Sequence, residues 1–142
     1  ELLGANEQKL ICCEVLQEAE TKPKETKQKG TKANAKRNNI TNIHFTAADA
    51  TQYMMNMAEN GQHADVVVMD PPRSGSTEEF VKTVAKLSPD RVVYVSCNPE
   101  TLKRDLEYLA KEGYCVMKIQ PVDMFPYTSH IETIVLLQKL NS

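Results

Sequence analysis

The stretch VVVMDPPR at residues 66–73 decides the fold of this chain. Its unbroken apolar run is typical of a strand buried on both faces of a parallel sheet. Asp70 ends the run, and the two prolines after it fix the backbone and remove two amide donors. An acid that follows such a strand lies at the sheet edge where α/β proteins bind ligands. The alternative is an ordinary turn with no ligand.

Working outward from residue 66, similar apolar runs alternate with helical patterns. Besides Val66 to Met69, strands are predicted at Leu10 to Val15, Ile43 to Ala47 and Val92 to Val95, and an antiparallel pair at Cys115 to Ile119 and Ile131 to Leu137. Helices are predicted at Thr51 to Asn60, Thr77 to Leu87 and Pro99 to Glu112, with Ser76 and Asn98 as N-caps and Gly113 as a stop. This alternation predicts an α/β fold with right-handed βαβ units and a mostly parallel, doubly wound sheet.

Composition narrows the class of protein. The chain has 142 residues, 41% of them apolar and 25% charged, as expected of one soluble globular domain. No secretory signal or membrane-spanning run is present, so we expect a cytoplasmic protein with no membrane partner. The four cysteines form no C-x-x-C pair and have no histidine at zinc-ligand spacing, which argues against a metal site.

Charge is unevenly distributed along the chain. The net charge of −2 argues against a protein that binds nucleic acid with its whole surface. Seven of the seventeen cations, however, lie between Lys22 and Arg37. Residues 20–32 are rich in lysine and threonine and lack apolar side chains, so we expect a solvated, flexible insertion there, with helix resuming near Ala33 and ending at Asn38-Asn39. An RNA-binding or nuclear-localisation segment is the alternative.

Acidic residues follow three successive predicted strands. Glu14 closes the first run, Asp49 follows the second and Asp70 ends the third. An acid at the Glu14 position can accept both hydroxyls of a ribose, and Asp49 can accept a hydrogen bond from an adenine amino group. Each acid alone could equally cap a helix or face water. As a series, they favour an adenosine-containing ligand.

Cys97 and Glu132 are the candidates for catalysis. Cys97 follows the fourth apolar run at the mouth of a helix, where amide groups and the helix dipole favour a thiolate nucleophile. A buried structural cysteine is the alternative. Glu132 begins an apolar strand, an unusual place for a carboxylate without a partner or a task. Near Glu132, His130 fits a hydrogen-bonding scaffold. Phe125 fits either a core residue or a platform on which a base stacks.

Three motifs in order then resemble a known family. They are DPPRSG at residues 70–75, YVSCNP at residues 94–99, and DMFP at residues 123–126 with His130-Ile131-Glu132. Together they resemble the RNA uracil-C5 methyltransferases, and the likeness runs from about Leu10 to Lys139. The resemblance implies a Rossmann-like class I fold and S-adenosylmethionine as cofactor. It also implies that a uridine in RNA becomes 5-methyluridine, with 23S ribosomal RNA preferred and transfer RNA possible.

The resemblance also implies a role for each candidate residue. Cys97 corresponds to the nucleophile and Glu132 to the general base, while the acids at Glu14, Asp49 and Asp70 correspond to cofactor ligands. We expect substrate contacts from Arg73, Phe125 and His130. A related motif in amino-methyltransferases acting on adenine or cytosine ends in an aromatic residue, and Arg73 has no ring. That departure disfavours the amino-methyltransferase alternative.

The sequence departs from the family pattern in two further ways, which concern whether the catalytic domain is complete. Family members carry a strand and a glycine-rich loop before the Glu14 strand, and N-terminal RNA-binding regions, which do not appear in this sequence. The lysine-rich segment also lengthens the connection after Glu14. We therefore expect residues 1–142 to be part of a catalytic domain, and an N-terminal RNA-binding domain in the full-length protein. An inactive fragment or a non-catalytic scaffold is the remaining alternative.

Overall fold

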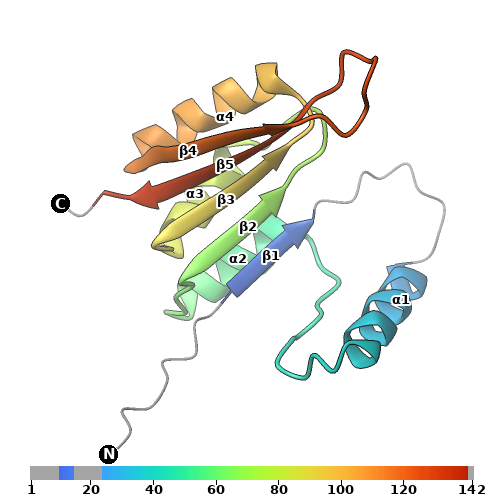
Figure 1. Cartoon of the computed structure of the whole chain (residues 1–142). Helices are drawn as coiled ribbons and strands as arrows, with labels where there is room; N and C mark the ends of the chain where they lie inside the picture. Colours follow the sequence, from blue (N-terminus) through green and yellow to red (C-terminus); the bar gives the residue numbers. More distant parts are fainter. Residues whose placement is uncertain (1–9, 15–23, 141–142) are drawn as a thin grey trace, which may run out of the picture. The chain divides into compact units, whose positions relative to one another are not determined.

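The computed structural model describes the backbone of residues 10–14 and 24–140 (Figure 1). The chain divides into two compact units: residues 1–16 with 50–142, here called the sheet unit, and residues 17–49, the smaller unit. Within the described residues, no helix is long and apolar enough to cross a membrane.

The described residues of the sheet unit form five strands, in the order β1-β2-β3-β5-β4. Their bounds are Leu10–Glu14 (β1), Val66–Asp70 (β2), Arg91–Ser96 (β3), Tyr114–Val122 (β4) and Glu132–Lys139 (β5). β1, β2 and β3 are parallel, whereas β5 runs antiparallel to both β3 and β4. The pairing of β4 with β5 contains a bulge between Val116 and Lys118. The predicted mostly parallel sheet with an antiparallel edge is confirmed.

Three helices form one layer behind this sheet (Figure 1). They are α2 (Ala50–Glu59), α3 (Glu78–Lys86) and α4 (Pro99–Lys111), as predicted within one or two residues at each end. Burial alternates along β2 and β3, so that Val67, Met69, Val92 and Tyr94 are buried in one core with residues of all three helices. The alternate residues between them on these strands are only half-buried.

The helix caps agree with the sequence in one case and differ in another. Asn98 caps α4 by accepting a hydrogen bond from the Glu100 amide (3.1 Å), as predicted. Ser76 does not cap α3; Thr77 does, accepting from the Phe80 amide (3.1 Å). The reason is that the Ser76 amide is bound to a carboxylate of α4, which leaves Thr77 as the last extended residue before the helix.

The predicted strand at Ile43 to Ala47 is wrong, because these residues are irregular. A strand needs a neighbour to satisfy its backbone groups. In the described part of the chain, no strand pairs with this segment, and Ile43 is 44% exposed.

The flexible insertion predicted at residues 20–32 is also corrected. Helix α1 spans Lys24–Arg37, whereas residues 20–23 lie outside the described residues. No proline interrupts residues 24–37, and lysine, glutamine and alanine are good helix formers. The predicted end of the helix is confirmed, with Asn39 at a φ of 55° and the Ile40 amide donating to the Ala35 carbonyl (2.9 Å).

Candidate active site

The register of β3 and β5 relates Cys97 to Glu132. Ser96 and Thr133 form the last opposed pair of this antiparallel ladder. Cys97 directly follows Ser96 and Glu132 directly precedes Thr133, so the two residues flank the last pair of this ladder at the same end of the sheet. Cys97 and Glu132 are both partly exposed, and Cys97 is a free cysteine. A thiol and a carboxylate therefore share one open end of the sheet.

A short hydrogen-bonded turn holds Cys97 in place. The Ser96 hydroxyl accepts from the Asn98 amide (3.1 Å) and donates to the Asn98 carbonyl (3.0 Å). Since Ser96 is buried and Asn98 caps α4, both neighbours of Cys97 are anchored. The turn presents the intervening cysteine at the partly exposed end of β3. The alternative of a cysteine buried in the core is excluded by this exposure.

Two of the three strand-end acids come together. Glu14 and Asp70 are register partners at the carboxyl ends of the parallel neighbours β1 and β2. The Asp70 side chain is exposed, whereas the Glu14 side chain lies outside the described ones. Asp49 directly precedes α2 and belongs to the smaller unit.

The loop after β2 reaches the loop before β5 through Arg73. The Arg73 Nη2 and His130 Nδ1 atoms are 2.7 Å apart. Because a guanidinium only donates hydrogen bonds, Nδ1 is the acceptor and the imidazole carries its proton on Nε2. His130 is thus oriented two residues before Glu132, in the role of a scaffold. The structure brings Arg73, His130 and Glu132 into one neighbourhood.

Phe125 lies in the connection between β4 and β5 and is 51% exposed, so the core alternative for this residue is wrong. Tyr127, in the same connection, is fully exposed at a φ of 70°. The hydroxyl of Thr128 donates to the Phe125 carbonyl (2.7 Å), which makes this connection a hydrogen-bonded turn. An aromatic ring is therefore presented to solvent on the loop that leads to Glu132.

Sequence reasoning missed Arg104 and Asp105 of α4. Asp105 is fully buried and bonded to the loop after β2, and Arg104 binds the same loop. The sequence signal that could have identified Asp105 is an acid three residues after Leu102, beside the apolar face of the helix.

Within the described residues, no group of three or more histidine, cysteine or acidic side chains is placed to hold a metal ion.

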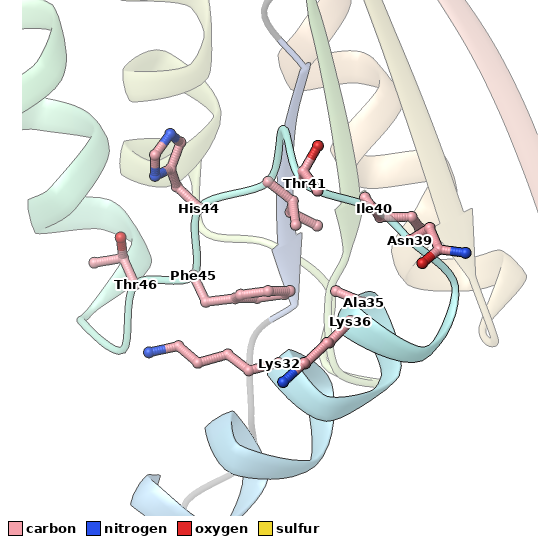
Figure 2. Close-up of a pocket in the computed structure, with 10 residues that line it drawn as sticks. Lys32, Ala35, Lys36, Asn39, Ile40, Thr41, His44, Phe45 and Thr46 are labelled. Atoms are coloured by element: carbon pink, nitrogen blue, oxygen red, sulfur yellow. The ribbon is translucent and has the colours of Figure 1, made fainter.

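The smaller unit has a cavity of its own, about 590 Å³ in volume. Figure 2 shows it between the last turns of α1, which carry Lys32 and Lys36, and the segment that carries His44 and Phe45. None of the candidate catalytic or cofactor-binding residues lines it. We therefore place the candidate active site at the ends of β2, β3 and β5 and not in this cavity.

A family model described as tRNA (uracil-5-)-methyltransferase matches residues 21–140. The chain belongs to this family. An uncharacterized RNA methyltransferase of Halalkalibacterium halodurans is 49% identical over 110 residues, a match that covers 78% of this chain and 24% of that protein. One from Clostridium acetobutylicum is 40% identical over 139 residues, covering 98% of this chain and 28% of that protein. The chain thus spans about a quarter of the length of these relatives.

Solved structures agree with this membership of the uracil-5-methyltransferase family. The tRNA (uracil-54, C5)-methyltransferase of Pyrococcus abyssi, solved with S-adenosyl-L-homocysteine, has 33% identity and a TM-score of 0.68, covering 80% of this chain and 26% of that one. A precorrin-6y C5,15-methyltransferase of Geobacter metallireducens has 19% identity and a TM-score of 0.58, covering 76% of this chain and 60% of that one. The second likeness concerns the fold alone, which is the Rossmann-like fold of class I methyltransferases.

Proposed function

We propose that this chain carries the catalytic residues of an enzyme that transfers a methyl group from S-adenosylmethionine to C5 of a uridine in RNA. The observation that carries the proposal is the β3–β5 register, whose last pair, Ser96 and Thr133, is flanked by Cys97 and Glu132 at the same end of the sheet. A nucleophile and a base must both reach one uracil ring, and two residues at the same end of neighbouring strands fit that requirement.

The residues at the ends of β1 and β2 fit the proposed cofactor. Carboxylates accept hydrogen bonds, and the ribose hydroxyls and adenine amino group of S-adenosylmethionine donate them. Glu14 and Asp70, as register partners at the ligand-binding edge of a parallel sheet, would hold the adenosine portion. S-adenosylmethionine supplies an electrophilic methyl group when bound.

Cys97 would make the uracil reactive. Uracil C5 is a weak carbon nucleophile, but addition of the Cys97 thiolate to C6 shifts the C5–C6 double-bond electrons into an enolate with charge at C5. After C5 is methylated, Glu132 would remove the C5 proton. The released electron pair restores the double bond as the sulfur–C6 bond breaks, which regenerates Cys97 and leaves 5-methyluridine.

The target base must leave its stack to reach this pair of residues. We propose a uridine in a single-stranded or loop region as the substrate, because such bases are accessible to side chains. Arg73 and His130 would contact its polar groups, and the exposed ring of Phe125 would stack on a base. Ribosomal RNA of the large subunit is the first candidate, and transfer RNA is the second, being the substrate named for the Pyrococcus abyssi neighbour.

The Cys97 mechanism predicts a covalent complex between protein and RNA. With RNA containing 5-fluorouridine, the full-length protein should form an adduct that survives denaturing electrophoresis, because fluorine at C5 cannot be removed as a proton is. Cys97→Ala should abolish both adduct and methylation. Glu132→Gln should accumulate the adduct on ordinary RNA and lower turnover by about 100-fold or more.

Cys115→Ala is the matched control, since Cys115 is also a partly exposed free cysteine but lies on β4 away from the ends of β2 and β3. It should form the adduct at the wild-type rate. Undiminished methylation by Cys97→Ala would overturn the mechanism. Nuclease digestion of methylated ribosomal and transfer RNA, followed by nucleoside analysis, identifies the product; N6-methyladenosine or N4-methylcytidine would instead establish an amino-methyltransferase.

A further inference from the structure

Asp105 is a buried charge that the proposed chemistry does not use. Its side chain is 0% exposed, and its Oδ2 accepts hydrogen bonds from the Ser76 amide (2.5 Å) and the Tyr94 hydroxyl (2.5 Å). A carboxylate is retained in an interior only when its lone pairs and charge are compensated. One of its two partners on Oδ2 is the backbone of the loop that follows Asp70, which links α4 to the candidate active site.

Arg104 supplies the compensating charge and binds the same loop. Its Nε and Nη2 atoms lie 2.9 and 2.8 Å from the Asp105 Oδ1. The Nη2 atom also donates to the carbonyls of Ser74 (2.9 Å) and Ser76 (3.0 Å). Carbonyls in a loop have no sheet partners, so this ion pair satisfies groups that would otherwise depend on water.

The first turn of α4 binds the remaining end of the loop. Asn98 Nδ2 and Thr101 Oγ1 each donate to the Arg73 carbonyl at 3.1 Å. The backbone from Arg73 to Ser76 is therefore bonded to α4 at four polar groups, and α4 begins two residues after Cys97. The helix fixes the loop after β2 relative to the cysteine turn.

Arg73 extends this linkage to the other side of the site through its 2.7 Å contact with His130 Nδ1. His130 is two residues from Glu132. A continuous series of bonds thus runs from α4, through the backbone and side chain of Arg73, to the segment that carries the proposed base.

We infer that Arg104 and Asp105 are positioning residues, which hold Arg73 so that its guanidinium orients His130 and the start of β5 opposite Cys97. The inference rests on the proposed function. Neither residue touches the substrate; they act through the loop. Displacement of a reacting group by about 1 Å costs about 100-fold in rate, so loss of this linkage should lower kcat more than it raises KM for RNA.

The test uses the full-length protein with Asp105→Asn and Arg104→Gln. Asp105→Asn keeps the shape of the side chain, but it replaces one accepting carboxylate oxygen with an NH2 group that lies beside hydrogen-bond donors. Arg104 is 43% exposed, so Arg104→Gln keeps the inference testable if Asp105→Asn does not fold. Each variant should lower kcat by about tenfold or more, with KM for RNA changed by less than about threefold. The nitrogen NMR shifts of His130 should change from the Nε2-protonated tautomer to a mixture, with His130→Asn identifying the resonance.

Tyr114→Phe is the control for stability. It removes a buried tyrosine hydrogen bond to the Pro89 carbonyl (2.9 Å), which has no contact with the loop. It should lower the melting temperature while leaving kcat and the His130 tautomer unchanged. If Arg104→Gln and Asp105→Asn keep wild-type kcat and tautomer, or if Tyr114→Phe loses kcat equally, the inference is overturned. Absence of a 5-fluorouridine adduct in the wild-type protein would instead refute the proposed function.

Discussion

Gly75 lies in the loop after β2, next to α4. Its φ of 76° lies in the left-handed region that side chains disfavour. A Cβ atom added here would lie 2.6 Å from both Arg104 Nη2 and Asp105 Oδ2, and 3.0 Å from Thr101 Cβ. The conformation and the space together require glycine, because the ion pair beneath it cannot move without losing its bonds.

Gly75→Ala should therefore destabilise the protein by about 2 kcal/mol or more, from backbone strain plus displacement of the ion pair. Gly61→Ala measures the contribution of backbone strain alone. Gly61 has a similar φ of 67° but no atom within 4 Å of the added Cβ, so a loss of about 1 kcal/mol is expected. Chemical denaturation of both variants measures the difference. Equal losses would mean that the loop accommodates a methyl group next to α4.

The N-caps of α3 and α4 can be compared through two matched variants, one in each helix. Thr77→Ala and Asn98→Ala each remove one side-chain acceptor at a helix N-terminus, for a loss of about 1 kcal/mol. Asn98 also donates to the Arg73 carbonyl (3.1 Å), so only Asn98→Ala should slow formation of the 5-fluorouridine adduct. Thermal unfolding and adduct rates measured on the same samples separate the two effects. If Thr77→Ala also slowed adduct formation, the rate would depend on helix stability in general and not on the bond between Asn98 and the Arg73 carbonyl.

The elements with clear local sequence signals were predicted correctly. These signals are the unbroken apolar runs at β2 and β3 and the Asn98-Pro99 start of α4, and all three elements are found in the structure. The segment at Ile43 to Ala47 failed because strand formation depends on a partner elsewhere in the chain. Ser76 failed as a cap for a similar reason, since its amide binds Asp105, 29 residues later.

The candidate site was predictable to a similar degree. The positions of Cys97 and Glu132 at strand ends follow from the apolar runs next to them, but only the pairing of β3 with β5 shows that the two ends lie at the same end of the sheet. Arg104 and Asp105 escaped notice because their partners, such as the carbonyls of Ser74 and Ser76, are backbone groups that no sequence pattern identifies.

For the whole molecule, two buried tyrosines set the response to alkaline pH. Burial raises the pKa of Tyr94, assisted by its hydrogen bond to Asp105, and burial likewise raises the pKa of Tyr114. Both remain protonated in the folded state when unfolded tyrosine ionises, near pH 10. The unfolded state then binds fewer protons, so stability is retained below about pH 10 and falls as the pH rises above it.

The expected slope is about 1.4 kcal/mol per pH unit for each tyrosine. Tyr114→Phe should remove about half of the combined slope, although it also loses the bond to the Pro89 carbonyl at every pH. Denaturation curves between about pH 8 and pH 11 measure both effects. An unchanged slope in Tyr114→Phe would mean that this hydroxyl ionises equally in both states.

The bulge in β4 has a consequence for how copies of the molecule meet. β4 ends the strand order and exposes Met117 and Ile119 along nine residues, which would make an unbroken edge prone to join another edge and aggregate. The bulge before Lys118 interrupts the row of amides, the lysine adds a charge that resists desolvation, and Pro121 contributes no amide at all. These features oppose edge-to-edge polymerisation through β4 while leaving its inner side paired with β5.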